Sequence, residues 1–133
     1  MQVIDFDGVA YKFPPLGHTS DKYVNKHKSE LHTKCRTLLQ TIFPARVFLE
    51  EVPIPGLKLY VDFFLIFSST VIEVQGRQHL EYTPHFHANK LEFYRARQRD
   101  ELKRRWCELN NIGMVELLYN EDISVWKSKI LGS

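Results

Sequence analysis

The sequence predicts a single mixed α/β (α+β) domain, in which helices flank a β-sheet with both antiparallel and parallel strands. Three extended stretches follow one another between residues 46 and 75, and turn residues separate them. A long helical pattern over residues 89–110 then leads to a fourth extended stretch. Consecutive short strands favour an antiparallel meander, whereas a strand–helix–strand unit favours a parallel crossover.

The first 28 residues are expected to form a hairpin and the start of the first helix. Residues 3–13 are extended on either side of Asp7-Gly8, a dipeptide typical of hairpin turns. Ser20 is a suitable N-cap for a helix that ends at Phe43-Pro44. The apolar positions of this helix recur at helical spacing, at Tyr23, His27, Leu31, Cys35, Leu38 and Ile42.

The strands are predicted from alternation of apolar and polar residues. Residues 46–54 form the first strand and stop at Pro55-Gly56. The second strand places Leu59, Val61 and Phe63 on one apolar face, with Asp62 on the opposite face. Residues 71–75 and 114–119 are the remaining strands, and residues 123–130 form a terminal helix.

The long helix is expected to pack along its length on the sheet. Its apolar face would consist of Leu91, Tyr94, Leu102, Trp106 and Leu109, with Gln98 among them. A buried amide needs hydrogen-bond partners, so Gln98 is predicted to point towards the strand ends near Glu73 or Gln75. The segment also carries three more positive than negative charges. This excess fits either a phosphate-facing surface or an ordinary solvated helix face.

Length and composition favour one globular domain. The chain has 133 residues, of which 44% are apolar and 26% charged, and its net charge is +2. No apolar run approaches the roughly 20 residues that span a bilayer, and the N-terminus lacks the pattern of a signal peptide. Cys35 and Cys107 have no metal-type spacing and are expected to be buried free thiols. Together these features favour a cytoplasmic protein.

Two carboxylates are predicted to meet on the second and third strands. Glu73 and Gln75 are two residues apart on one strand, so they share a face and lie roughly 6.6 Å apart. Asp62 converges with Glu73 if the two strands form a hairpin. A divalent ion such as Mg²⁺ relieves the repulsion between such carboxylates and can activate water against a phosphodiester. Alternatively, Glu73 and Gln75 lie on a solvated face of the sheet.

These residues resemble the very-short-patch-repair (Vsr) branch of the PD-(D/E)xK nucleases. The signature of that branch is Asp, then Glu-x-(Asp or Gln)-Gly-x-Gln-His, and the chain has Asp62 followed by Val71-Ile72-Glu73-Val74-Gln75-Gly76-Arg77-Gln78-His79. Residues 98–103, Trp106-Cys107 and residues 117–121 resemble the helix and strand that follow. Ser29-Glu30-Leu31 resembles the helix that contributes a glutamate, so the resemblance covers residues 29–123.

The resemblance implies a restriction-endonuclease-like sheet and a metal-dependent endonuclease that acts on double-stranded DNA, including branched or mismatched DNA. It is compatible with a phage or mobile-element origin, and with a monomer or a homodimer. Mg²⁺, or alternatively Mn²⁺, would be held by Asp62 and Glu73. The expected catalytic residues are Asp62, Glu73, Gln75, His79 and Glu30. Residues expected to support them or contact substrate are Gln78, Gln98, Asp100 and Lys103. Those expected to bind DNA are Arg77, Lys90, Arg95, Arg99 and Arg104.

One departure keeps other functions open. The generic superfamily motif has Lys where this chain has Gln75, and an amide can orient a water but carries no charge. Lys103 or His79 could supply the missing function. The alternatives are a DNA-binding module whose catalysis is weakened or lost, and a partner-binding protein with an incidental acidic cluster. RNA also remains open as a substrate.

Overall fold

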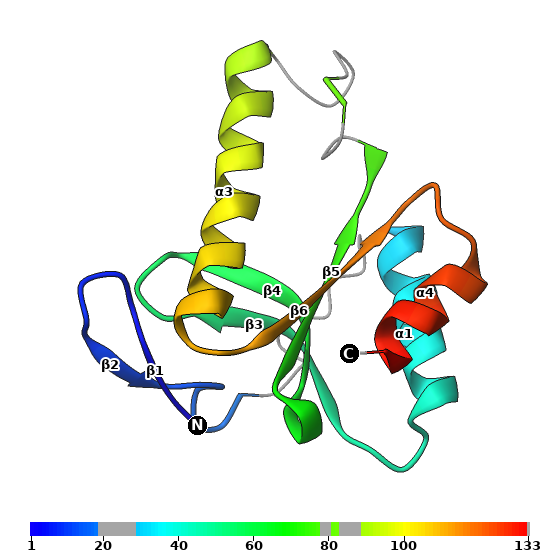
Figure 1. Ribbon diagram of the computed structural model, residues 1–133, viewed down its shortest axis with the longest axis horizontal. Coiled ribbons are helices and arrows are strands. Elements are labelled where there is room, and N and C mark those ends of the chain that lie inside the picture. Colours follow the sequence, from blue (N-terminus) through cyan, green and yellow to red (C-terminus); the bar gives the residue numbers. More distant parts are fainter. Residues whose placement is uncertain (19–28, 78–80, 83–88, 133) are drawn as a thin grey trace.

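A computed structural model describes residues 1–18, 29–77, 81–82 and 89–132, and its elements form a mixed α/β fold (Figure 1). The central sheet has four strands in the order β3-β4-β5-β6, and a separate hairpin comprises β1 and β2. The elements are β1 (Gln2–Ile4), β2 (Ala10–Lys12), α1 (Glu30–Ile42), β3 (Phe48–Ile54), β4 (Leu59–Leu65), β5 (Thr70–Gln75), α3 (Lys90–Leu109), β6 (Gly113–Leu118) and α4 (Ile123–Leu131).

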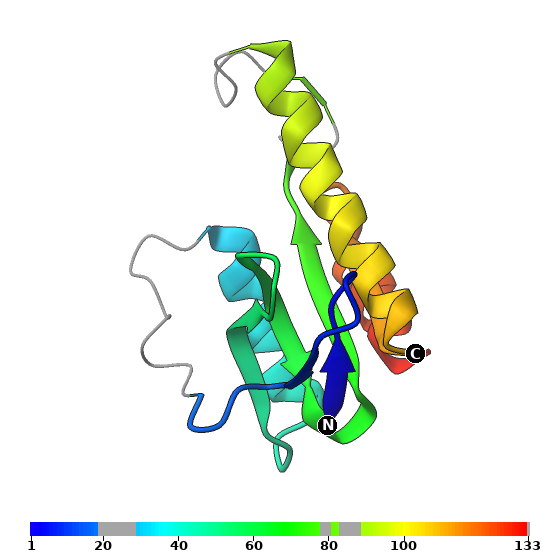
Figure 2. The ribbon, with the colours of Figure 1, turned by 90° about the vertical axis from the view of Figure 1, so that its left-hand side faces the viewer.

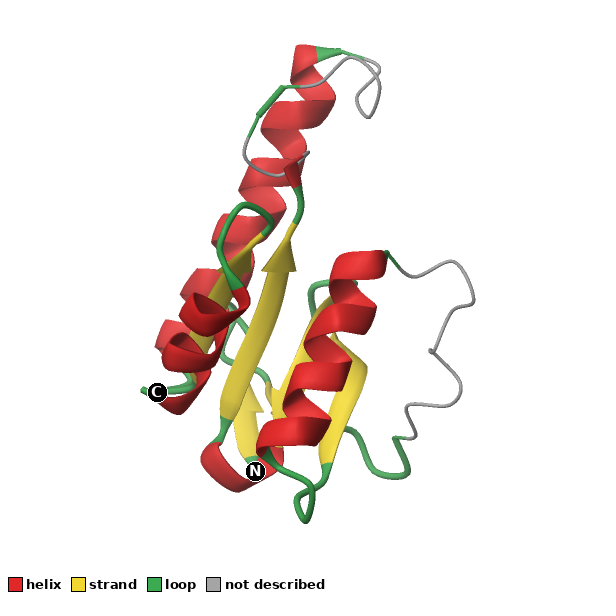
Figure 3. Ribbon diagram, turned by 90° about the vertical axis from the view of Figure 1, so that its right-hand side faces the viewer, coloured by secondary structure: helices red, strands yellow, loops and turns green. Residues whose placement is uncertain are grey.

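The predicted topology of the sheet is confirmed. Strand β4 pairs antiparallel with both β3 and β5, whereas β5 and β6 are parallel and α3 connects them. Helices α1 and α4 lie on one face of the sheet, and α3 lies on the other (Figures 1 and 3). Each face therefore has its own core. Cys35, Leu39, Trp126 and Ile130 belong to the first core, and Trp106 belongs to the second.

The N-terminal hairpin forms as predicted and belongs to the core on the α3 side. Gly8 in its turn has a φ of +84°, and the Asp5 carboxylate accepts the N–H groups of Asp7 and Val9, each at 2.9 Å. The ring of Phe13 contacts Phe64 and Trp106 at centroid distances of 4.8 and 5.0 Å. The packed unit thus extends beyond residues 29–123 at both ends, since α4 also contributes buried side chains.

Helix α1 begins later than predicted. Ser29 is its N-cap, with extended backbone angles, and its hydroxyl accepts the N–H of His32 at 3.2 Å. Ser20, the predicted cap, lies outside the described residues. The predicted end is confirmed, because Phe43 is the C-cap. The consequence for the site is that His32 occupies the first turn of this helix.

Helix α3 has the predicted bounds, with Asn89 and Asn110 as its caps, but the predicted apolar face is wrong in its N-terminal half and at Leu109, which is 45% exposed. Leu91 and Tyr94 are 52% and 59% exposed, and Gln98 is also exposed. At about 1.5 Å per residue the helix is about 30 Å long, whereas a six-residue strand reaches only about 20 Å. The N-terminal half therefore projects beyond the sheet, and only the C-terminal half packs on it (Figures 1 and 2). Within the described ranges, no helix is long and apolar enough to cross a membrane.

Candidate active site

Regular alternation of side chains between the two faces of the sheet is interrupted in β3 and in β4, at neighbouring positions of the two strands. Glu50 contacts α1 whereas Val52 packs in the core on the α3 side. In β4, Val61 packs on the α3 side and Phe63 on the α1 side, so the prediction that they share a face was wrong. The switch falls at Glu51, whose φ is +51°, and at Asp62, and both residues lie between the paired positions Glu50–Phe63 and Val52–Val61. Two acidic residues therefore lie where the regular pairing of β3 and β4 is interrupted.

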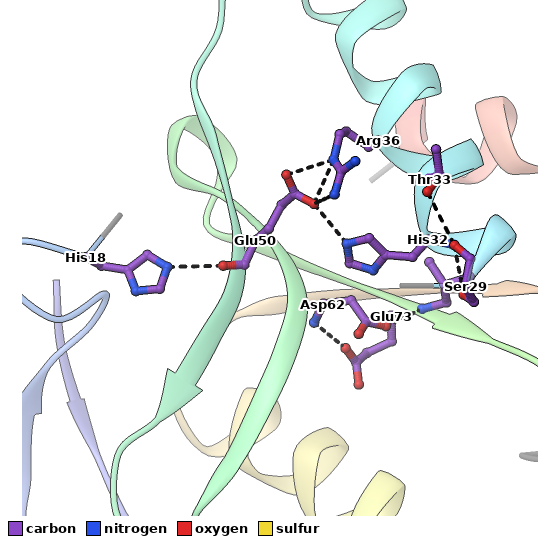
Figure 4. A network of polar contacts seen from close by, with 9 residues as sticks. His18, Ser29, His32, Thr33, Arg36, Glu50, Asp62 and Glu73 are labelled. Atoms are coloured by element: carbon purple, nitrogen blue, oxygen red, sulfur yellow. Dashed lines mark hydrogen bonds and ion pairs between the residues drawn. The ribbon is translucent and has the colours of Figure 1, made fainter. Parts of the chain in front are cut away.

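Asp62 and Glu73 converge, as the sequence predicted, where β4 and β5 separate. Regular pairing of the two strands ends at Phe63 and Ile72. Beyond that point, Glu73 Oε2 accepts the N–H of Asp62 at 2.7 Å, and Asp62 Oδ2 accepts the N–H of Val74 at 2.8 Å. Each carboxylate therefore bonds to the main chain of the other strand. Figure 4 shows the two side chains beside each other.

Lys103 of α3 brings a positive charge to this pair of carboxylates. Its Nζ lies 2.7 Å from Glu73 Oε1, and the Lys103 and Glu73 side chains are 15% and 4% exposed. Burial raises the pKa of Glu73 to about 8, Asp62 adds to the rise, and Lys103 only partly offsets it. Burial lowers the pKa of Lys103, but the carboxylates of Glu73, Asp62 and Asp100 outweigh this and raise it. When both carboxylates are ionised, one positive charge does not neutralise them, so the site favours an added cation.

A second group of side chains surrounds Asp62 from the α1 side. His32 of α1, Glu51 of β3 and Asp62 offer ligand atoms that all lie within 4.8 Å of one another. His32 is buried, and the two acidic residues are half-buried. Asp62 is thus common to the predicted pair with Glu73 and to this group. The donor set, one imidazole and two carboxylates, fits a divalent metal ion.

Two contacts hold His32 in place, and Arg36 fixes one of the two contacting groups. Its Nε2 lies 2.8 Å from Glu50 Oε1, and its ring stacks on Phe63 with a centroid distance of 4.4 Å. Arg36, one turn further along α1, contacts the same carboxylate through Nε at 2.9 and 3.0 Å. Figure 4 shows the imidazole between Glu50 and Asp62. Packing and hydrogen bonds therefore fix both the position and the plane of the ring.

The Glu50 contacts predict a loss of stability in acid. Burial alone would raise the pKa of Glu50, but the hydrogen bonds from His32 and Arg36 outweigh it and lower the pKa. A carboxyl with a lowered pKa in the folded state stabilises the fold above its unfolded pKa of about 4.5, and this contribution disappears as pH falls through the folded value. The difference in melting temperature between wild type and Glu50→Gln should therefore shrink from pH 7 to pH 3. A difference that grows in acid would contradict this assignment.

Gln75 is buried on the α3 side of the sheet. Its Nε2 lies 3.4 Å from Glu116 Oε2, and its Oε1 is buried with no hydrogen-bond partner in the described part of the chain. Arg104 binds both oxygens of Glu116 and also contacts Glu101 at 3.0 Å. Carboxylates thus contact the guanidinium of Arg104, so its predicted binding of DNA would compete with Glu116 and Glu101. The pKa of Arg104 is raised by the hydrogen bond to Glu116, against the opposing effect of burial.

The other predicted residues differ in exposure and in their contacts. Glu30 is exposed at the start of α1 and lies outside the group of His32, Glu51 and Asp62. Arg77 pairs with Glu81 at 2.8 Å, whereas Asp100 is buried near Lys103. Gln78 and His79 lie outside the described residues. Lys90, Arg95 and Arg99 are exposed on α3, where the described residues give them no ion pair.

Gln98 is exposed, so the expectation that it is a buried amide on the packed face of α3 is wrong. We expect Gln98→Leu to leave any nicking activity unchanged and to alter stability by no more than about 0.5 kcal/mol, as is usual at surface positions. Urea denaturation and a plasmid assay would measure both. A tenfold loss of activity in a folded Gln98→Leu protein would show that this amide acts on the site.

Sequence reasoning missed His32, Glu50 and Glu51. His32 precedes Cys35 by three residues, so both lie on the buried face of α1, and this spacing could have identified it. Glu50 and Glu51 are adjacent, and strand alternation predicts that one of them faces inwards. Neither pattern indicates that the two acidic side chains approach the same histidine.

Comparisons with known proteins identify viral relatives. The chain is 45% identical over 65 residues to Uncharacterized protein 307L of Invertebrate iridescent virus 6, covering 46% of this chain and 33% of that protein. It is 34% identical over 96 residues to Uncharacterized protein 033L of Invertebrate iridescent virus 3, covering 68% and 50%. It is 35% identical over 81 residues to Uncharacterized protein 094L of Frog virus 3, covering 59% and 52%. The matches thus span about half the length of these relatives or less. No family model and no solved structure matches the chain.

Proposed function

We propose that the protein is a metal-dependent endonuclease that hydrolyses phosphodiester bonds in double-stranded DNA. The observation that carries this proposal is the meeting of Asp62, Glu73 and Lys103 where β4 and β5 separate. The order of motifs that resembles the Vsr-like nucleases supports the same function. A mixed sheet flanked by helices is also the fold that the resemblance implies.

The residues have distinct roles in this proposal. Asp62 and Glu73 would supply the oxygen ligands, and a bound Mg²⁺ or Mn²⁺ would supply positive charge and lower the pKa of water, which makes hydroxide available as the nucleophile. Lys103 compensates for the uncharged Gln75, because its ammonium group approaches Glu73 from α3. Once substrate is bound, Lys103 is placed to stabilise negative charge on the phosphate.

The exposed half of α3 is the proposed DNA-binding surface. Lys90, Arg95 and Arg99 lie there, on the same projecting segment. Contacts from such side chains to phosphates position a nuclease without reading sequence. Arg95→Gln with Arg99→Gln should therefore weaken DNA binding and make it less dependent on salt. A monomer with one site would nick one strand, whereas a homodimer could cut both.

The direct test is a supercoiled-plasmid assay with Mg²⁺, with Mn²⁺ and with EDTA, alongside a structured RNA. The proposal predicts relaxation of the plasmid that requires metal and is abolished by EDTA. Binding of DNA without any cleavage would instead favour a DNA-binding module whose catalysis is lost, the alternative suggested by Gln75. Cleavage of RNA alone would contradict the proposed substrate. The buried thiols Cys35 and Cys107 are compatible with action in a reducing cytoplasm.

A further inference from the structure

We propose that His32, Glu51 and Asp62 form a site that binds Mn²⁺ in preference to Mg²⁺, with Glu50 as the residue that positions His32. This inference deepens the proposed function, on which it rests for the use made of the ion. It names two ligands, His32 and Glu51, that the sequence did not predict. Metal binding itself can be measured without any nuclease activity.

The orientation of His32 leaves one ring nitrogen available to a metal. Arg36 Nε–H donates to both oxygens of the Glu50 carboxylate, at 2.9 and 3.0 Å, and a carboxylate paired with a guanidinium in this way only accepts hydrogen bonds. The contact at 2.8 Å therefore places the proton of a neutral imidazole on Nε2. Nδ1 then carries the free lone pair. A carboxylate that binds the far nitrogen in this way fixes the tautomer and makes the imidazole a stronger ligand.

The two acidic ligands owe their positions to the change of face in β3 and β4. Glu51 and Asp62 lie between the paired positions Glu50–Phe63 and Val52–Val61, and the φ of Glu51, +51°, departs from the extended backbone of the strand. Glu50, the preceding residue, contacts His32, so β3 provides both a ligand and the group that orients another ligand. An ordinary strand would direct Glu50 and Glu51 to opposite faces of the sheet.

The imidazole determines which metal the site prefers. Mg²⁺ favours oxygen ligands and retains several waters, whereas a nitrogen ligand suits first-row transition metals better. Two carboxylates and one imidazole form a mixed oxygen and nitrogen site. Among the transition metals, Mn²⁺ is the one whose preference for oxygen ligands is most like that of Mg²⁺, so it suits both kinds of ligand. Asp62 would hold either ion, but His32 would strengthen the binding of Mn²⁺ alone.

The test measures Mn²⁺ affinity from the EPR signal of free Mn²⁺, and Mg²⁺ affinity by competition. Wild type should bind Mn²⁺ at least about tenfold more tightly than Mg²⁺. His32→Gln should remove most of that difference, and Glu50→Gln should weaken Mn²⁺ binding by about 10–100-fold, the usual effect of losing a group that orients a ligand. Mg²⁺ affinity should change little in both variants. His18→Gln is the matched control, because His18 Nε2 bonds the main-chain oxygen of Glu50 at 3.1 Å rather than its carboxylate.

A spectroscopic measurement on the wild-type protein avoids dependence on folding of the variants. Electron spin-echo modulation of bound Mn²⁺ should show coupling to an imidazole ¹⁴N. Mn²⁺ that binds without this coupling, or a folded His32→Gln protein that keeps the wild-type preference, would overturn the site. If the protein nicks DNA but bound Mn²⁺ shows no coupling to an imidazole ¹⁴N, the His32 site is wrong and the proposed nuclease function stands. Nitrogen-coupled Mn²⁺ without nicking would leave the site intact and overturn the proposed function.

Discussion

Asp62→Asn is expected to abolish metal-dependent nicking while leaving DNA binding intact. Asp62 joins both the predicted pair with Glu73 and the group with His32 and Glu51, so its charge serves any ion bound there. We expect a loss of at least about 10²–10³-fold, the scale on which single groups that stabilise the transition state act. Steady-state nicking of a supercoiled plasmid measures the loss, and a gel-shift assay measures binding.

The fold should tolerate this substitution. Asp62 Oδ2 accepts the N–H of Val74, and the amide oxygen of asparagine can accept the same bond. Phosphate contacts would come from basic side chains of α3, so affinity for DNA should stay near wild type. Asp7→Asn is the matched control, because Asp7 is exposed in the turn of the N-terminal hairpin. Nicking at the wild-type rate by a folded Asp62→Asn protein would refute the mechanism.

Lys103→Met is expected to reduce both nicking and stability. The substitution leaves the Glu73 carboxyl buried without its ammonium partner, and breaking a buried pair in this way costs about 3–5 kcal/mol. The raised pKa of Glu73 places the loss at the lower end, because the carboxyl can take up a proton instead. Guanidinium denaturation measures the stability. Nicking should fall because the uncharged Gln75 cannot replace the lost ammonium group.

A double variant separates the two effects. Glu73→Gln with Lys103→Met removes both charges, so most of the lost stability should return, whereas nicking should remain absent. Lys129→Met is the control, since its pair with Glu121 is more exposed and should contribute no more than about 1 kcal/mol. Full activity of a folded Lys103→Met protein would exclude Lys103 from the chemistry.

The sheet and the pair of Asp62 and Glu73 could be predicted because both depend on local pattern. Alternating residues identified the strands, and the placement of Asp62 and Glu73 on consecutive strands that form a hairpin identified where the carboxylates meet. The extent of α3 beyond the sheet could not be predicted in this way. Helical periodicity shows which face of a helix is apolar, but the length of the neighbouring strands decides how much of that face is covered.

The group around His32 was missed for a different reason. It depends on the interruption of side-chain alternation at Glu51 and Asp62. This interruption coincides with the positive φ of Glu51. Residues with positive φ are usually glycine or asparagine, so a glutamate gives no signal of such a conformation. A pattern that assumes regular alternation then assigns Val61 and Phe63 to the same core, although they pack on opposite faces.

The left-handed backbone at Glu51 lowers the stability of the fold, whereas the Glu51 side chain is a proposed metal ligand. A glutamate in this conformation costs about 1 kcal/mol relative to a residue that adopts it freely. Glu51→Gly should therefore raise the unfolding midpoint in metal-free solution, although glycine also increases the entropy of the unfolded chain and reduces the gain. The same change removes a metal ligand, so the added stability on metal binding should fall. Selection for a robust fold alone would favour glycine here, whereas glutamate at this position is the choice expected where function is under selection.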